Sequence, residues 1–149
     1  MPVNADAEGR SYGPFEPYEV TRVKIREFAD AVDALSGAHR DTAVAKAEGY
    51  DDVVAPTTFA VVIAQRAEFH VVVDPQVGVD FSKVVHADER FTLTRPLVAG
   101  DLISTTVHID KIVQRGGISM VTTRAELTDI EGDHVATVTS TLAVREDAA

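Results

Sequence analysis

The feature that most constrains this fold is a change of hydrophobic period close to Lys83. Beyond that residue the chain contains four β-rich runs of about twelve residues, "VVHADERFTLTR", "LISTTVHIDKIV", "ISMVTTRAELTD" and "HVATVTSTLAVR". Apolar and polar residues alternate along these runs, which is the period of a strand with one buried face. The connections "PLVAGD", "QRGG" and "IEGD" supply the glycine and aspartate that tight turns need. The pattern predicts four long antiparallel strands joined by short turns.

The segment before this change, "VVAPTTFAVVIAQRAEFHVVV", predicts one buried helix. Pro56 suits the first turn of a helix, and Thr57 or Thr58 is a candidate cap. From Phe59 to Phe69 the chain is apolar on almost all sides, which favours a helix in the interior over one on the surface. Val71 to Val73 is assigned to a brief strand. One helix and four long strands make an α+β domain, in which the sheet curls around the central helix.

The first fifty residues predict smaller elements. Residues 1–17 are expected to be irregular, and "YEVT" (18–21) is expected to form a short strand. Apolar residues recur every three or four positions from Arg22 to about Ala34, which predicts a helix. A second, short helix is predicted after the cap candidate Asp41, ending near Gly49. The length of 149 residues is that of a single domain, taken as 1–149.

Composition excludes several functions. The chain has no cysteine and a net charge of −10, so it lacks a disulfide framework and repels nucleic acid and anionic membranes. No apolar run reaches the roughly 20 residues of a membrane helix, and the start of the chain has no signal pattern, so we expect a cytoplasmic protein. The histidines at 70, 108 and 134 lack metal spacing, and Gly116-Gly117 reads as a hairpin turn. We expect neither a metal nor a cofactor.

Three motifs give the chain a family resemblance. "FADAVDALSGAHRD" is similar to the segment Gly-Asp-x-Asn-Pro-x-His-x-Asp that follows a short helix in the MaoC-type (R)-hydroxyacyl dehydratases and hydratases. "VVAPTTFA" is similar to the start of the central helix in the actinobacterial and fungal branch of that family, and "HADERFTLTRPLVAGD" to the strand and turn that follow it. The chain resembles in particular the UPF0336 proteins and the mycobacterial 3-hydroxyacyl-ACP dehydratase subunits that work as heterodimers. Each motif is weak alone, but their order spans roughly residues 18 to 142.

The resemblance implies a hot-dog fold and a reaction. The family removes water reversibly from a (3R)-3-hydroxyacyl thioester to give a trans-2-enoyl thioester, with a histidine as base and an aspartate acting on the hydroxyl. His39 stands at the position of the base, and Asp41 matches the acidic residue two positions later. The start of the central helix, carrying the candidate substrate-binding residues Pro56, Thr57, Thr58 and Phe59, helps to form the oxyanion hole. A helix N-terminus suits that role because its free N–H groups favour negative charge.

The chain departs from the family pattern before His39. Ala34 stands where the family has its catalytic aspartate, and Asp33 stands one residue too early, where the family has glycine. One position is about 100° of rotation on a helix, so Asp33 replaces the missing acid only if the segment has left the helix. General acid–base groups contribute about 10²–10⁴-fold each. We therefore expect a weakly active or non-catalytic subunit.

Two readings of the whole chain follow. The preferred one is a component of a (3R)-3-hydroxyacyl thioester dehydratase or enoyl thioester hydratase of fatty-acid metabolism, acting on acyl-CoA or acyl-ACP. It would form a homodimer, or a heterodimer with a MaoC-type catalytic subunit. The alternative is a non-enzymatic acyl-thioester-binding or assembly module. Arg95 is expected in a turn, with contact to a carrier phosphate as the alternative, and the apolar residues 61–63 are expected in the core, one or two of them lining an acyl tunnel.

Overall fold

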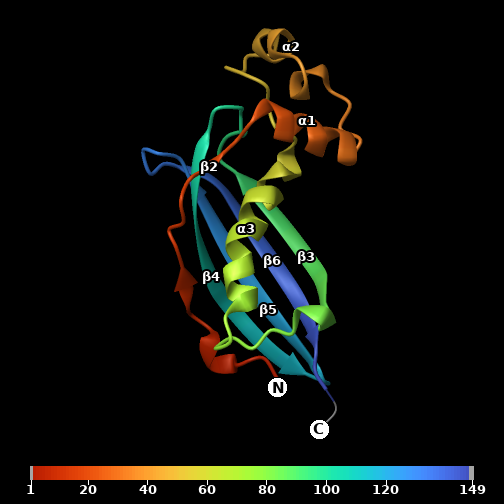
Figure 1. The fold of residues 1–149 in the computed structure, drawn as a ribbon, viewed down its shortest axis with the longest axis vertical. Coiled ribbons are helices and arrows are strands. Elements are labelled where there is room, and N and C mark those ends of the chain that lie inside the picture. Colours follow the sequence, from red (N-terminus) through yellow and green to blue (C-terminus); the bar gives the residue numbers. More distant parts are fainter. Residues whose placement is uncertain (1, 148–149) are drawn as a thin grey trace.

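The computed structural model describes residues 2–147, which form a curved antiparallel sheet around one long helix (Figure 1). The long strands are β3 (Val84–Leu93), β4 (Leu102–Arg115), β5 (Ile118–Thr128) and β6 (His134–Arg145). Two short strands, β1 (Ser11–Tyr12) and β2 (Tyr18–Glu19), both pair with β4. The order across the sheet is β1-β4-β5-β6-β3. The predicted α+β arrangement and its four long strands are confirmed.

The strands have the two-sided character that their sequence predicts. Along β5 the residues Val121, Thr123, Ala125 and Leu127 are buried, while the residues between them are partly exposed. Gly116 and Gly117 adopt φ angles of +60° and +75° between β4 and β5, which is the backbone of a two-residue hairpin turn. Register shifts at residues 86/88 of β3 and 109/111 of β4 mark irregularities of the bulge type, which increase strand bending and twist.

The central helix, α3 (Ala60–Val73), lies across the concave face of the sheet (Figure 1). Residues 71–73 belong to this helix, so the strand predicted there is wrong. The helix continues until Asp74, which is extended because it precedes a proline. The expected threonine cap is also wrong. The chain enters α3 through a 3-10 turn at Thr57–Phe59, so both threonines lie inside the turn and no side chain caps it.

Only one side of α3 is buried. Its residues Ile63, Ala64, Ala67, Glu68 and Val71 are buried, with Phe59 at its start fully buried against the edge of Phe28. On the outer side Phe69 and Val73 remain 55% and 53% exposed. The expectation of a helix buried on almost all sides therefore does not hold for the single chain. No helix among residues 2–147 has the length and apolar character needed to cross a bilayer.

The N-terminal residues are more ordered than predicted. They contain a 3-10 turn at Ala5–Ala7 and strand β1, and β2 lies within the strand predicted at 18–21. Both strands cover the outer edge of β4, a long-range pairing that local sequence does not encode. On the opposite side of the sheet, β6 is the one strand among residues 2–147 that pairs with β3.

Helices α1 (Arg22–Ala31) and α2 (Thr42–Ala47) gather at one end of the sheet, beyond the start of α3 (Figure 1). Helix α1 ends about three residues before the predicted boundary. Helix α2 agrees with its prediction, since the Asp41 carboxylate accepts a hydrogen bond from the Ala43 N–H at 2.7 Å and Gly49 has a φ of +96°. The segment between these two helices carries the residues that the sequence singles out.

Candidate active site

The end of α1 removes Ala34 from the helix. Asp33 has a φ of +54°, the left-handed conformation that commonly follows a helix and that aspartate tolerates better than most residues. The Ala34 N–H then turns back and donates to the Ala29 carbonyl at 2.9 Å. The chain therefore leaves the helix at Asp33 and Ala34, the two positions at which the catalytic acid is in question.

Arg40 fixes the loop that follows. One guanidinium nitrogen donates to the carbonyls of Ala34 (2.7 Å) and Ser36 (3.0 Å), and the remaining two donate to the Asp30 carboxylate at 2.7 and 3.2 Å. Four hydrogen bonds from one planar group hold the backbone of the loop against α1, because the guanidinium presents its donors in a rigid fork.

His39 closes a short 3-10 turn, Gly37–His39, and its position is fixed by its neighbours. Ala38 is buried in a small apolar cluster with Ala45 and Val54, and its carbonyl accepts from the Val54 N–H at 3.0 Å. The His39 ring adds a contact of 2.7 Å between Nδ1 and the Val54 carbonyl. A carbonyl only accepts, so Nδ1 carries the proton and Nε2 is the basic nitrogen of the neutral ring.

The segment that carries Val54 is itself held to α1. Arg22 at the start of α1 makes a bidentate contact of 2.9 and 2.8 Å with the Asp52 carboxylate. The hydrogen bonds from Arg22 and from the Val53 N–H lower the pKa of Asp52 to about 2. Asp52 is therefore charged at neutral pH and keeps α1 beside the strand-like segment that leads into α3.

His39 lines a cavity of about 580 Å³ at the start of α3. This volume lies within the range of small-molecule sites. The wall comes from four parts of the chain: Ala34 and His39, then Tyr50, then residues 54–57 before α3, and finally residues 93–96 at the end of β3. No carboxylate lines it within the described residues. The polar groups are the imidazole, one phenol, two threonine hydroxyls and one guanidinium.

The structure brings together some of the predicted site residues and separates others. Pro56 and Thr57 line the cavity with His39. Thr58 is exposed and Phe59 lies in the core, and neither lines the cavity. Asp33 is exposed and outside the cavity wall, whereas Ala34 is part of that wall.

Two further candidates have defined surroundings. The Asp41 carboxylate is engaged as the cap of α2. Arg95 lines the cavity and is held by the Asp101 carboxylate at 2.8 and 3.1 Å, with Asp129 3.8 Å away. The hydrogen bonds with Asp101 raise the pKa of Arg95, and its charge is already compensated. A carrier phosphate would have to compete with two carboxylates for this guanidinium.

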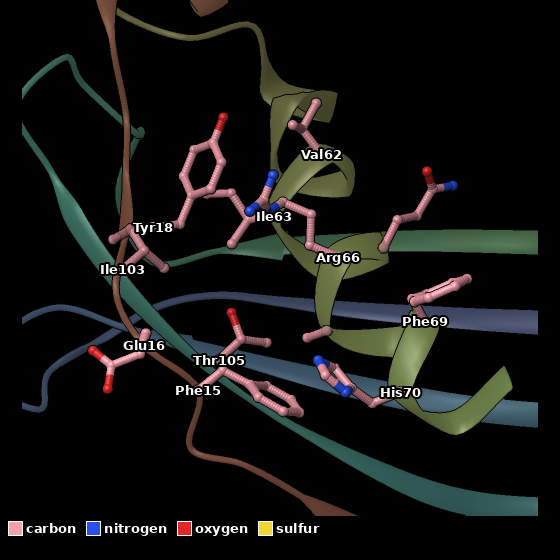
Figure 2. A pocket seen from close by; sticks show the side chains of 12 residues that line it. Phe15, Glu16, Tyr18, Val62, Ile63, Arg66, Phe69, His70, Ile103 and Thr105 are labelled. Carbon is pink, nitrogen blue, oxygen red and sulfur yellow. The ribbon is translucent and has the colours of Figure 1, made fainter. Parts of the chain in front are cut away.

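A larger cavity of about 690 Å³ lies along α3, between the helix, the segment 15–18 and β4. Figure 2 shows Arg66 directed toward the ring of Tyr18, with its guanidinium carbon 5.4 Å from the ring centroid. Farther along, the His70 ring is stacked on Phe15 with centroids 4.3 Å apart. Val62 and the neighbouring Ile63 line this cavity, so two residues of the predicted apolar set 61–63 border open space.

Sequence reasoning missed Tyr50, Leu93 and Thr94 as parts of the smaller cavity. Tyr50 follows the glycine that ends α2, and the other two end β3 and begin the turn after it. Each reaches the cavity through tertiary packing. Their local sequence contains no signal beyond their place next to a predicted turn.

Comparisons with known proteins identify the family of the chain. The family model described as "FAS1-like, dehydratase domain region" matches residues 6–138. The chain belongs to this family. It is 49% identical over 145 residues to a UPF0336 protein of Saccharopolyspora erythraea, an alignment that covers 97% of this chain and 93% of the relative. The resemblance to the UPF0336 branch is confirmed.

Two solved structures extend the comparison. A MaoC-like dehydratase superposes with a TM-score of 0.86 and 33% identity, covering 94% of this chain and 42% of that one. This chain therefore spans less than half of that protein. The C-terminally truncated HadBC (3R-hydroxyacyl-ACP dehydratase) complex of Mycobacterium tuberculosis superposes with a TM-score of 0.84 and 30% identity, covering 93% and 97% of the two chains. The hot-dog fold and the MaoC-like dehydratase relationship are confirmed.

Proposed function

We propose that this chain is a subunit of a (3R)-3-hydroxyacyl thioester dehydratase, weakly active by itself, whose full activity requires a MaoC-type partner. One observation carries the proposal. His39 and Ala34 line the same cavity, and no carboxylate of the described chain lines it with them. The site has a base and lacks the acid that its family resemblance calls for.

The chemistry explains why the acid matters. In the dehydration a base takes the α-proton, the C–O bond at the β-carbon breaks, and an acid protonates the departing hydroxyl as the C=C bond forms. His39 is suited to the first step because its Nδ1–H is committed to the Val54 carbonyl, which leaves Nε2 free to accept a proton. The start of the 3-10 turn has no side-chain cap, so its N–H groups are available to an enolate oxygen. A missing acid costs about 10²–10⁴-fold in rate.

The partner would add to the sheet at β3. This strand pairs with β6 on one side, and no strand of the described residues pairs with its outer edge. Val85 on β3 and Phe81 just before it are 64% and 68% exposed, and Phe69 of α3 is 55% exposed. A ten-residue edge beside apolar side chains favours pairing with a second sheet. The HadBC relative is itself a complex, which supports assembly with a partner chain.

A direct test measures hydration of crotonyl-CoA by the purified chain, alone and with a MaoC-type partner. We expect little turnover alone and at least a tenfold higher rate in the complex. His39→Ala is compared with His108→Ala, which removes a histidine that contacts Ser11 and does not line the cavity. Full turnover by the chain alone, abolished by His39→Ala and not by His108→Ala, would refute the incomplete site.

The second candidate function is acyl-thioester binding without turnover, and the larger cavity favours it. That cavity is lined mainly by apolar side chains such as Val62 and Ile63, which suit an acyl chain. The discriminating result is binding of a medium-chain acyl-CoA, weakened by Val62→Trp, together with no turnover in the presence of any partner. Turnover in a complex would exclude this second function.

A further inference from the structure

A buried acidic side chain lies between α3 and the sheet, remote from the His39 cavity. Glu68 is 6% exposed, and its Oε1 accepts a hydrogen bond from the Thr123 hydroxyl of β5 at 3.1 Å. It lies eleven residues after Thr57, which corresponds to about 16 Å along a helix. Neither the acid–base chemistry nor the packing of α3 requires a carboxyl group at this position.

A second carboxylate faces the first from the edge strand. Glu89 of β3 accepts from the Ser140 hydroxyl of β6 at 2.5 Å through Oε2. Its other oxygen, Oε1, is buried and has no hydrogen-bond partner within residues 2–147. Two carboxyl groups from opposite layers thus share one buried region with two hydroxyl donors.

The charge of this pair is not compensated. Within the described residues no lysine or arginine lies within ion-pair distance of either carboxylate, and the nearest basic group is His86, whose Nδ1 is 3.7 Å from Glu89 Oε2. Arg90, the neighbour of Glu89, is exposed on the opposite face of β3. The groups that contact the pair are His86 of β3, Thr123 of β5 and Ser140 of β6. Gln65 of α3 lines a small cavity together with Glu68 and His86. Two unpaired charges this close and this buried are costly, so one of them is neutralised by a proton.

We propose that Glu68 and Glu89 form a proton-binding pair that couples pH to the attachment of the edge strand β3. One proton, held on Glu68, keeps the layers together at mildly acidic pH. When it dissociates, two negative charges oppose each other across the α3–β3 contact, and the strand along which a partner would add is loosened. The link to assembly rests on the proposed function, whereas the link to stability does not.

The sign of the effect follows from the direction of the pKa shift. Burial, and then the nearby Glu89 charge, raise the pKa of Glu68 to about 7. The folded chain therefore holds a proton that the unfolded chain has released, and the stability it confers is fully present below about pH 4.5 and is lost as the pH rises to about 7. The folding equilibrium constant falls by up to about tenfold per pH unit in this window and then levels off.

The pair is tested by chemical unfolding of the wild type, Glu68→Gln and Glu131→Gln between about pH 5 and about pH 8. Glu68→Gln keeps the shape of the protonated side chain. We therefore expect the free energy of unfolding of this variant to change little with pH and to exceed that of the wild type at high pH. Glu131 is exposed in the β5–β6 turn, and its variant should follow the wild type. At neutral pH the wild type and Glu131→Gln should show the infrared band of a buried carboxylic acid, and Glu68→Gln should lack it.

Several outcomes would overturn the pair. One is a Glu68→Gln profile identical to that of the wild type. Another is a pH dependence of stability that disappears in His86→Gln and persists in Glu68→Gln, since His86 would then be the titrating group. If Glu68→Gln does not fold, Glu89→Gln provides the second test, because removing the like charge should move the pH dependence to lower pH. An unchanged profile in that variant contradicts the pair.

Assembly is measured separately, as association with a MaoC-type partner at about pH 6 and about pH 8. We expect weaker association of the wild type at the higher pH, and no such change in Glu68→Gln. Equal wild-type affinity at both values would overturn the coupling. If the chain associates with the partner at neither pH, the proposed function is refuted. The unfolding profiles would still decide whether the proton-binding pair exists.

Discussion

Ala34 stands at the position where the family resemblance implies the catalytic aspartate. Ala34 lines the same cavity as His39, and its carbonyl is held by Arg40 at 2.7 Å. The loop geometry therefore depends on the backbone of residue 34 and on Arg40, and the side chain of residue 34 is not needed to maintain it. A longer side chain at this position would extend from a backbone that is already fixed.

Ala34→Asp should raise the hydration rate of the isolated chain toward crotonyl-CoA by about tenfold or more, because it returns a carboxyl group to the cavity. Leu35→Asp is the matched control, since it adds the same charge at a neighbouring side chain that is 84% exposed. Steady-state kinetics of both variants, with circular dichroism to verify folding, provides the measurement. A folded Ala34→Asp variant with unchanged activity would mean that the loop does not direct residue 34 toward the substrate.

The sequence motifs single out His39, Pro56 and Thr57, and these three residues meet in one cavity. Their roles in catalysis stay predictions. The local sequence around Tyr50 and Arg95 does not predict that they line this cavity, because turns between distant elements bring them there. The position of Asp33 depends on its own positive φ angle at the end of α1. The spacing of apolar residues does not predict that angle.

At the scale of elements, β3 differs from the other long strands. It is the outermost long strand on its side of the sheet, and its burial pattern shows four consecutive exposed residues, Val85 to Asp88, before regular alternation resumes. The irregularity at 86/88 lies within this stretch. The exposed side chain of Val85 is apolar, which is unusual for an edge that faces water and consistent with an edge that pairs.

Val85→Lys should weaken association with a partner by at least tenfold, because a lysine on an edge strand opposes the approach of another strand. The stability of the separate chain should change little, since Val85 is 64% exposed. Sedimentation velocity compares this variant with Ile130→Lys, which alters a 74% exposed residue in the β5–β6 turn. Equal loss of association in both variants would attribute the effect to charge in general and not to β3.

The success of prediction also differed between elements. The four long strands and α3 were recognisable because a buried face imposes its period over ten residues or more. The short strands β1 and β2 owe their existence to β4, and the last turn of α3 contains three valines whose strand preference is overridden by the helix that they continue. Tertiary contacts decided each of the elements that local pattern missed.

At the scale of the whole molecule, we propose that the loop region around α1 and α2 and the wrapped sheet form one folding unit. Val20 and Ile25, on either side of the start of α1, belong to the same apolar core as α3 and the strands. The Arg22–Asp52 and Val54–Val98 contacts add further links between the two regions. Because α1 packs into the main core and the small Ala38 cluster is tied to the sheet through Val54 and Val98, we expect a single cooperative transition.

Urea unfolding followed by far-ultraviolet circular dichroism and by tyrosine fluorescence should give coincident curves. Circular dichroism reports mainly on the sheet and α3, whereas Tyr50 reports on the α2 region and both Tyr12 and Tyr18 report on the edge of β4. Fluorescence of a Tyr50→Phe variant separates the Tyr50 signal from that of the other two tyrosines. A separate, earlier transition in the Tyr50 signal would show that the α1–α2 region unfolds independently, and the chain would then contain two units.

The pairing of β1 and β2 with β4 has a consequence for what this sheet can build. Because the N-terminal segment lies along the outer side of β4, the proposed assembly would accept a single neighbour, at β3. Deleting the segment 11–19 should expose a second sheet edge and allow end-to-end growth. In the proposed assembly the N-terminal segment would therefore prevent polymerisation, besides forming part of the wall beside α3.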